Sequence, residues 1–291
     1  MNFEAFVNDI KLNNWNVYGV EVYKDGELIH SYGDTTKNHY PIYSATKTIT
    51  SIAVGMAVDE GKLDISKSVL EYLPEDVICR LPKEQIEAYG KINTERLLTM
   101  SVAGYPFRPE GENWLSDALN YKLENPTQRI FDYSNVSAYL AGVVTACAVK
   151  EDLYEYLNRK LFKPLGIEKP VFMRCPEGYF YGASGMELSV HELSQIGLLL
   201  YHDGMYEGKR ILSETYVKEA TGIRQMNREG GYGYFIWKYR SGFSINGKWK
   251  QKCYVLPEQK MVITYLSHIE EEMPELKASM EKHILGISSS I

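Results

Sequence analysis

The pattern of apolar and polar positions predicts strands near both ends of the chain and helices between them. Residues 17–23 and 27–32 are strand-like and flank Asp25-Gly26, a pair typical of a tight hairpin turn. Residues 232–239, 253–256 and 261–266 are also strand-like, with a turn at 257–260. From about residue 45 to 225 the pattern is mostly helical, and residues 270–286 predict a last helix with Pro274 near its start.

This order predicts an α+β fold in which both ends of the chain contribute to one antiparallel sheet. We expect residues 1–44 and 226–291 to form a sheet subdomain, and residues 45–225 to form a helical subdomain. With 291 residues, the chain is long enough for one large domain or two closely packed subdomains. The junction between the two parts is where we expect an active-site cleft.

Ser44 and Lys47 stand at the start of the first helix of the middle segment. Apolar residues at 49, 52, 53, 56 and 57 mark one buried helix face, and Gly61 is a plausible stop. Side chains three residues apart on a helix share a face, with Cβ atoms about 5–6 Å apart. Serine is a poor nucleophile unless an adjacent base activates it, so the spacing indicates nucleophilic catalysis. The alternative is a helix cap beside a surface lysine.

The motif Ser-x-x-Lys and a second motif, Tyr-x-Asn, each occur twice. Ser279-Met-Glu-Lys282 lies in a charged amphipathic segment, so we do not expect it to be catalytic. Tyr133-Ser-Asn135 lies on a short loop before an apolar helix, from which a phenol can project into a cleft. Tyr156-Leu-Asn158 belongs to an amphipathic helix pattern and indicates packing. Since the chain has 23 tyrosines, a core position is the alternative for Tyr133 too.

Together these residues resemble the penicillin-recognising serine hydrolases, which include class C β-lactamases, D-alanyl-D-alanine carboxypeptidases and related esterases and amide hydrolases. The resemblance covers roughly residues 16–268 and includes residues 55–64, 97–101, 164–166 and 183–186. It implies a β-lactamase-like fold in which Ser44 Oγ attacks an ester, amide or β-lactam carbonyl. Lys47, alone or with Tyr133, would remove the serine proton, and Tyr133 would protonate the leaving group. Asn135 would hold Lys47 and the substrate amide oxygen.

The third motif of the family, usually Lys-Thr-Gly or a variant with His or Trp, is changed here. We align Ile245-Asn246-Gly247 with it, to within one or two residues. Ile245 then replaces the cationic or aromatic residue, and Lys248 or Trp249 is the nearest side chain able to touch a substrate. The resemblance also implies that the backbone N–H groups of Ser44 and Lys248 form the oxyanion hole. The missing cation argues against a substrate carboxylate and favours esterase-like or amide-hydrolase-like activity.

Lysine and tyrosine both have ordinary pKa values of about 10, so a base near neutral pH needs a perturbed environment. Burial lowers the pKa of a lysine, and a nearby cation lowers the pKa of a tyrosine. Both effects cannot act fully at once, and we expect Lys47 and Tyr133 to share one proton and titrate as a unit. No residue is identified as the base for a deacylating water.

Composition narrows the possible partners and location. The net charge of −6 argues against nucleic acid, and alternating Lys248, Lys250 and Lys252 predict a solvated strand edge. No membrane span is expected, because no run of eighteen apolar residues occurs. No signal peptide is visible, so the chain as written is expected in the cytoplasm, and loss of an export signal by shortening is the alternative. Four scattered cysteines predict free thiols, and the histidines predict no metal site; we expect no cofactor.

The sequence therefore predicts a serine acyl-enzyme hydrolase acting on a small-molecule or peptide substrate. The alternative is a catalytically weak penicillin- or peptide-binding protein, or a scaffold. The intact set of Ser44, Lys47 and Tyr133 favours the enzyme, because a scaffold has no need of it. The natural substrate and the oligomeric state are not encoded in any recognisable motif.

Overall fold

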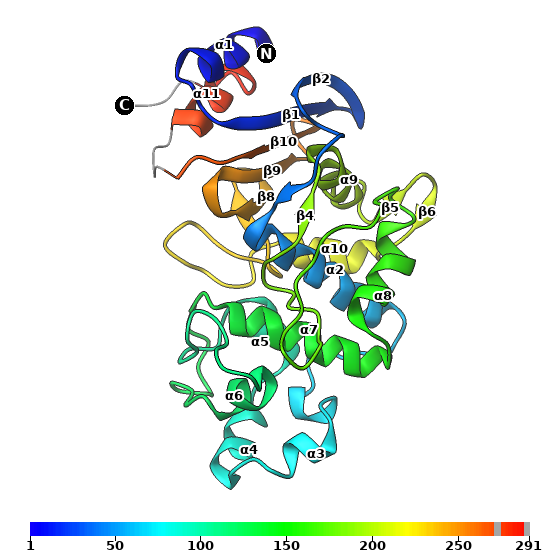
Figure 1. Cartoon of the computed structure of the whole chain (residues 1–291), viewed down its shortest axis with the longest axis vertical. Coiled ribbons are helices and arrows are strands. Elements are labelled where there is room, and N and C mark those ends of the chain that lie inside the picture. Colours follow the sequence, from blue (N-terminus) through cyan, green and yellow to red (C-terminus); the bar gives the residue numbers. More distant parts are fainter. Residues whose placement is uncertain (271–274, 288–291) are drawn as a thin grey trace.

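A computed structural model describes residues 1–270 and 275–287 of the chain. Its centre is a six-stranded antiparallel sheet with the order β2-β1-β10-β9-β8-β7, seen in the upper half of Figure 1. The strands are β1 (Val17–Lys24), β2 (Glu27–Gly33), β7 (Trp237–Tyr239), β8 (Gly242–Gly247), β9 (Gln251–Leu256) and β10 (Met261–Ser267). Because β1 pairs with β10, segments from both ends of the chain meet inside one sheet.

The hairpin between β1 and β2 turns at Asp25 and Gly26, as the sequence predicts. Both residues have positive φ angles, +53° and +85°. A two-residue hairpin loop of type I′ needs positive φ at both positions, because its twist then matches that of the strands. The predicted turn is confirmed.

Helices cover both faces of the sheet. On one face, α1 (Phe3–Leu12) and α11 (Glu275–His283) bury Phe6 and Met280 against β1, β9 and β10. On the other face lies α9 (Val190–Tyr201), which comes very close to β9. A Cβ atom added to Gly197 would lie 2.4 Å from Cys253 Sγ, so glycine is needed at this crossing.

The helical part packs around two long buried helices, α2 (Thr46–Asp59) and α7 (Asn135–Val149), which are shown below the sheet in Figure 1. Gly55 of α2 leaves room for the ring of Tyr216. Short elements complete this part: β3 (Tyr40–Pro41), β4 (Glu187–Leu188), β5 (Met205–Tyr206), β6 (Lys209–Arg210), α3 (Glu75–Ile78), α4 (Lys83–Tyr89), α5 (Thr94–Leu98), α6 (Trp114–Asn120), α8 (Leu153–Leu157) and α10 (Glu214–Thr221).

The predicted α+β class with its antiparallel sheet is confirmed, but two local predictions are wrong. The expected strand 232–239 is reduced to Trp237–Tyr239, because the backbone N–H groups of Tyr234 and Phe235 donate to Ala220 and Leu98 of the helical part. Residues 248–250 form a 3₁₀ turn, so their lysines do not alternate along a strand. The division into residues 1–44 plus 226–291 and residues 45–225 stays a prediction. Pro274 lies outside the described residues.

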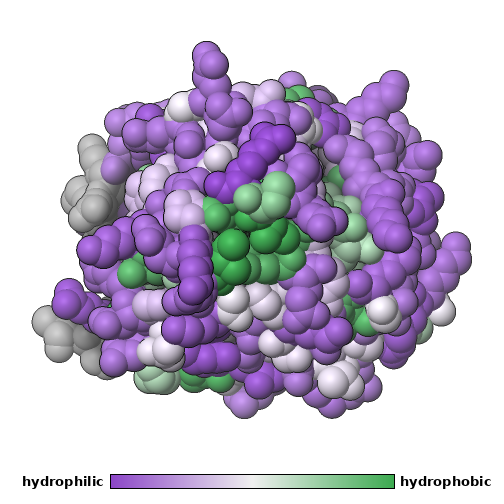
Figure 2. Space-filling view, turned by 90° about the horizontal axis from the view of Figure 1, so that it is seen from below, coloured by the Kyte–Doolittle hydropathy of each residue, from purple (hydrophilic) through white to green (hydrophobic). Residues whose placement is uncertain are grey.

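The surface is mostly hydrophilic where α3 and α4 lie, with an apolar patch near the centre of that view (Figure 2). None of the helices in the described residues combines the length and apolar character needed to cross a bilayer.

Candidate active site

Ser44 lies in a tight 3₁₀ turn, Tyr43–Ala45, immediately before α2. Tyr43 has a φ angle of +48°, in the left-handed region that residues with side chains rarely adopt. The turn is fixed by Thr46 Oγ1, which donates to the carbonyl of Tyr43 at 2.7 Å. Strain of this kind is retained only where surrounding structure holds it, and it concentrates at functional sites. Ser44 is therefore presented by a rigid turn at the predicted helix start.

Lys47 is buried one turn further along α2, with 1% of its surface exposed. Its Nζ lies 3.1 Å from Ser44 Oγ, 2.6 Å from Asn135 Oδ1 and 2.8 Å from the carbonyl oxygen of Ala183. Burial lowers the pKa of Lys47 to about 7, because desolvation penalises the charged form. A neutral amine has two N–H groups and one lone pair, so Asn135 and Ala183 can accept while Ser44 donates. That is the arrangement of a general base facing its nucleophile.

Tyr133 lies beside this pair, at the entry to α7. Lys47 Nζ is 4.9 Å from the centroid of the Tyr133 ring, which stacks against Trp237 at 5.8 Å. Burial raises the pKa of Tyr133 to about 12, although a hydrogen bond with Ser44 acts in the opposite direction. These two shifts favour a neutral Lys47 and a protonated Tyr133 near neutral pH, and the predicted titration of the pair as a unit stays a prediction.

Asn135 is the first residue of α7, where Ser134 caps the helix by accepting from the backbone N–H of Val136 at 3.0 Å. Asn135 Nδ2 donates to Tyr181 Oη at 3.0 Å, which orients its Oδ1 toward Lys47. The structure thus brings the four residues of the first two motifs together: Ser44, Lys47, Tyr133 and Asn135.

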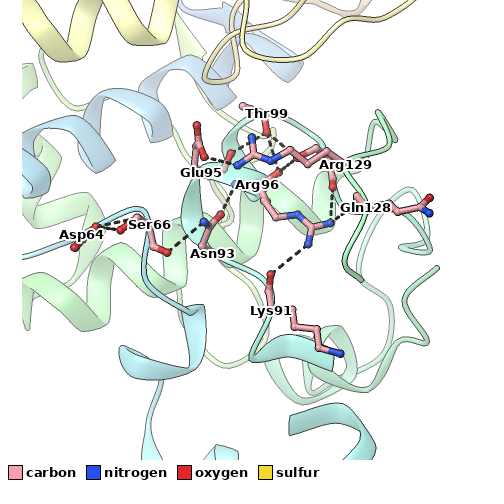
Figure 3. A network of polar contacts seen from close by, with 10 residues as sticks. Asp64, Ser66, Lys91, Asn93, Glu95, Arg96, Thr99, Gln128 and Arg129 are labelled. Atoms are coloured by element: carbon pink, nitrogen blue, oxygen red, sulfur yellow. Dashed lines mark hydrogen bonds and ion pairs between the residues drawn. The ribbon is translucent and has the colours of Figure 1, made fainter. Parts of the chain in front are cut away.

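Arg96 of α5 holds the loop that leads to Tyr133 (Figure 3). Its guanidinium is buried and donates to four backbone carbonyls: Lys91 at 3.2 Å, Ser101 at 3.0 Å, Gln128 at 2.5 Å, and Pro126. Next to it, Arg129 pairs with Glu95 at 2.5 Å. Because these contacts fix residues 126–129, the backbone just before the catalytic tyrosine candidate has little freedom.

The third motif lies on β8, directly beside the serine turn. A Cβ atom on Gly247 would lie 2.2 Å from the carbonyl oxygen of Ile42, so only glycine permits this close approach. Asn246, Gly247 and Lys248 line the same pocket as Ser44. This segment therefore forms one wall of the candidate site, and its alignment with the third motif stays a prediction.

Two residues predicted for this wall lie elsewhere. Ile245 is fully buried in the core, because successive residues of a strand point to opposite faces and Asn246 occupies the pocket face. Trp249 packs on His268 with ring centroids 4.1 Å apart and touches Tyr43 edge-on at 5.0 Å. Neither side chain lines the pocket: Ile245, the position aligned with the cation of the third motif, points into the core, and the predicted contact of Trp249 with a substrate stays a prediction.

The pocket has a volume of about 370 Å³ and contains residues that belong to no motif. Lys252 is the most informative, because it brings a cation into a site where the motif has lost one. It lies on β9 directly opposite Asn246, a pairing that no sequence pattern indicates. Other lining residues missed by the sequence are Phe107, Ser184, Glu229 and Trp237.

The second copies of the two motifs lie outside the Ser44 pocket and make structural contacts. Ser279 Oγ donates to Asp9 at 2.7 Å between α11 and α1, and Tyr156 is buried in the core. The four cysteines are free. In residues 1–270 and 275–287, no cluster of three His, Cys, Asp or Glu side chains is arranged to hold a metal ion.

The model of the Beta-lactamase family matches residues 17–283 of this chain. Among curated proteins, a "Putative D-alanyl-D-alanine carboxypeptidase" from Salmonella paratyphi A is 26% identical over 167 residues, covering 52% of this chain. The match spans only 38% of that relative's length.

Two solved structures share the fold. A "Putative 6-aminohexanoate-dimer hydrolase" from Bacillus anthracis has a TM-score of 0.77 at 18% identity, covering 96% of this chain and 80% of that one. A beta-lactamase/D-alanine carboxypeptidase from Pseudomonas syringae has a TM-score of 0.73 at 15% identity, covering 97% of each chain. At these identities the likeness concerns the fold.

Proposed function

The chain belongs to the beta-lactamase family, and we propose that it is a serine hydrolase that forms an acyl-enzyme on Ser44. One observation carries the proposal: Lys47 is buried with no carboxylate partner among the described residues, has a lowered pKa and lies 3.1 Å from Ser44 Oγ. A lysine in that state accepts a proton near neutral pH, which an exposed lysine cannot do.

In the proposed acylation step, the lone pair of Lys47 accepts the Ser44 proton as Oγ attacks the substrate carbonyl. The backbone N–H groups of Ser44 and Lys248 would stabilise the oxyanion; removing one such donor typically costs roughly 3–4 kcal/mol. Tyr133 gives its phenolic proton to the leaving group, and the proton that Lys47 took from Ser44 then restores the phenol, which leaves Lys47 neutral again. The leaving group departs with one added proton, and Ser44 holds the acyl group. Water then releases the acid and restores the serine hydroxyl.

We propose an ester, amide or β-lactam carbonyl as the reacting group. The carboxypeptidase name of the curated relatives supports testing a peptide substrate beside simple esters. A pocket of about 370 Å³ has room for a small molecule or the end of a peptide.

The test is covalent labelling of Ser44. The protein is incubated with a fluorescent penicillin, a fluorophosphonate and a p-nitrophenyl ester, and the Ser44→Ala variant is compared with wild type. Ser279→Ala is the matched control, because it removes the serine of the second Ser-x-x-Lys copy.

We expect label and turnover to disappear in Ser44→Ala and persist in Ser279→Ala. Labelling that survives in Ser44→Ala refutes the nucleophile assignment. Stable labelling of wild type without turnover on any carbonyl class would instead support the weakly catalytic binding protein.

A further inference from the structure

Lys252 is a cation that the proposed mechanism does not use, yet it lines the Ser44 pocket. It also lines a second hollow of about 400 Å³, which Trp237, Tyr254 and Lys277 help to enclose. The two hollows share Glu229, Trp237, Asn246 and Lys252, so they are adjacent to each other. Lys252 therefore lies on the border between the reaction pocket and the second hollow.

Within the part of the chain that the structure describes, the Lys252 ammonium has neither an ion pair nor a side-chain hydrogen bond. The enclosure lowers the pKa of Lys252 to about 8, chiefly through desolvation, with Lys277 acting in the same direction and Glu229 against it. An enclosed cation without a partner is costly unless a ligand supplies one. Asn246, which faces Lys252 across the β8–β9 pair, has a buried Oδ1 that accepts no hydrogen bond from the residues in ranges 1–270 and 275–287.

The two acidic residues that line the second hollow, Glu281 and Glu229, do not form an ion pair with Lys252. Glu281 is engaged by Arg240 at 3.2 Å and by Lys277 at 3.8 Å, and it accepts a hydrogen bond from Tyr239. Glu229 is exposed and lies beyond ion-pair distance of Lys252. The positive charge of Lys252 is thus not neutralised by its neighbours.

We propose, on the basis of the acyl-enzyme function above, that Lys252 determines specificity by binding a carboxylate of the substrate. The sequence predicts that the changed third motif has lost its cation. The structure supplies a different cation, from the next strand, to the same wall of the pocket. The carboxylate accepts from the Lys252 ammonium, and the group that carries it extends toward the second hollow; Asn246 Oδ1 is an acceptor and would take an N–H or O–H donor of the substrate instead.

Two matched pairs of aryl esters test the proposal. In one pair the phenol leaving group carries the charge: 3-acetoxybenzoate against 3-acetoxybenzamide. In the other pair the acyl group carries it: the monophenyl ester of isophthalic acid against phenyl 3-carbamoylbenzoate. Values of kcat/KM are measured near neutral pH. If turnover is slow, the second-order rate of Ser44 acylation is followed by mass spectrometry.

We expect wild type to prefer the carboxylate in at least one pair by about tenfold or more, as for a charge-assisted contact in an enclosed site. Lys252→Met abolishes that preference, measured as the ratio of the two kcat/KM values within each pair. Lys252→Arg retains the preference. Lys250→Met, which removes a nearby lysine outside the pocket, leaves it unchanged.

Arg108 provides the decisive control, because it is an exposed cation in another hollow that also touches Asn135. Loss of the preference in Arg108→Met but not in Lys252→Met overturns the proposal, as does a wild type without preference in either pair. The Ser44→Ala variant distinguishes a failure of the proposed acyl-enzyme function from a failure of the proposed role of Lys252. If it still hydrolyses the esters, the acyl-enzyme function is wrong; if it is inactive while wild type does not discriminate, only the role of Lys252 is wrong.

Discussion

A carboxylate in place of the Asn135 amide tests the proton chemistry of the site most directly. Asn135 Oδ1 lies 2.6 Å from Lys47 Nζ, and Asn135→Asp changes the charge while keeping the size. A negative charge at this distance favours the protonated amine and raises a lysine pKa by about 1–3 units. Asn135→Asp therefore raises the pKa of Lys47 without moving its side chain.

The expected fall in kcat/KM follows from the lowered pKa of Lys47. With a pKa of about 7, about 76% of the lysine is neutral at about pH 7.5, against about 0.1% at the ordinary value of 10.5. In Asn135→Asp, a pKa of about 8 to 10 leaves about 24% to 0.3% neutral. We therefore expect kcat/KM at about pH 7.5 to fall roughly 3- to 250-fold, with recovery as pH rises.

The assay is the pH profile of kcat/KM for an uncharged p-nitrophenyl ester, corrected for spontaneous hydrolysis. In wild type the rate rises with pH through a midpoint near 7 and levels off about one unit above it, because the neutral amine is the active form and its fraction increases as the proton leaves. In Asn135→Asp the whole rise moves to higher pH, whereas Asn135→Leu does not move it upward. An unchanged midpoint in Asn135→Asp, or a wild-type midpoint near 10, refutes Lys47 as the base.

Three further predictions concern the groups around this pair. Tyr133→Phe keeps the aromatic packing but removes the proton donor, and we expect kcat to fall about 10²–10⁴-fold while the midpoint of the pH profile stays near 7. Arg96→Met leaves four carbonyls without their donor, and we expect urea denaturation to show a loss of roughly 3 kcal/mol or more. The exposed control Arg80→Met should change stability by about 0.5 kcal/mol or less. Gly55→Ala places a Cβ 2.4 Å from the Tyr216 ring, so it should destabilise by about 1–3 kcal/mol, although helix propensity alone predicts a gain. A more stable Gly55→Ala protein would contradict this packing.

The parts of the site that sequence predicts well are those set by local geometry. Ser44 and Lys47 meet because residues three apart share a helix face, and the hydrogen bond at 3.1 Å follows from that spacing. The loop position of Tyr133 before α7 was likewise readable from the polar-to-apolar change there. Which of Lys47 and Tyr133 carries a proton near neutral pH cannot be read from the sequence, because it depends on how deeply each group is buried in the assembled fold.

Lys252 shows why the rest could not be predicted. Alternation along one strand places Lys248, Lys250 and Lys252 on one face. The chain instead turns at residues 248–250, where Trp249 and Lys250 adopt positive φ angles of +58° and +68°. The next strand, β9, begins at Gln251 and places Lys252 opposite Asn246. A turn that uses residues other than glycine in left-handed conformations gives no sequence signal, so the pairing register was hidden.

The pairing of β1 with β10 has a consequence for how the protein is made. A ribosome delivers residues in order, and domains generally begin to fold from the N-terminal side. Strand β1 therefore emerges more than two hundred residues before the strand that completes its hydrogen bonds, whereas α2 and α7 can pack much earlier. The nucleophile and its base can thus assemble on the nascent chain while the wall formed by β8 is still missing. We expect translation products that end before Met261 to expose the edge of β1 that β10 covers in the complete fold, and such an edge is a common starting point for aggregation.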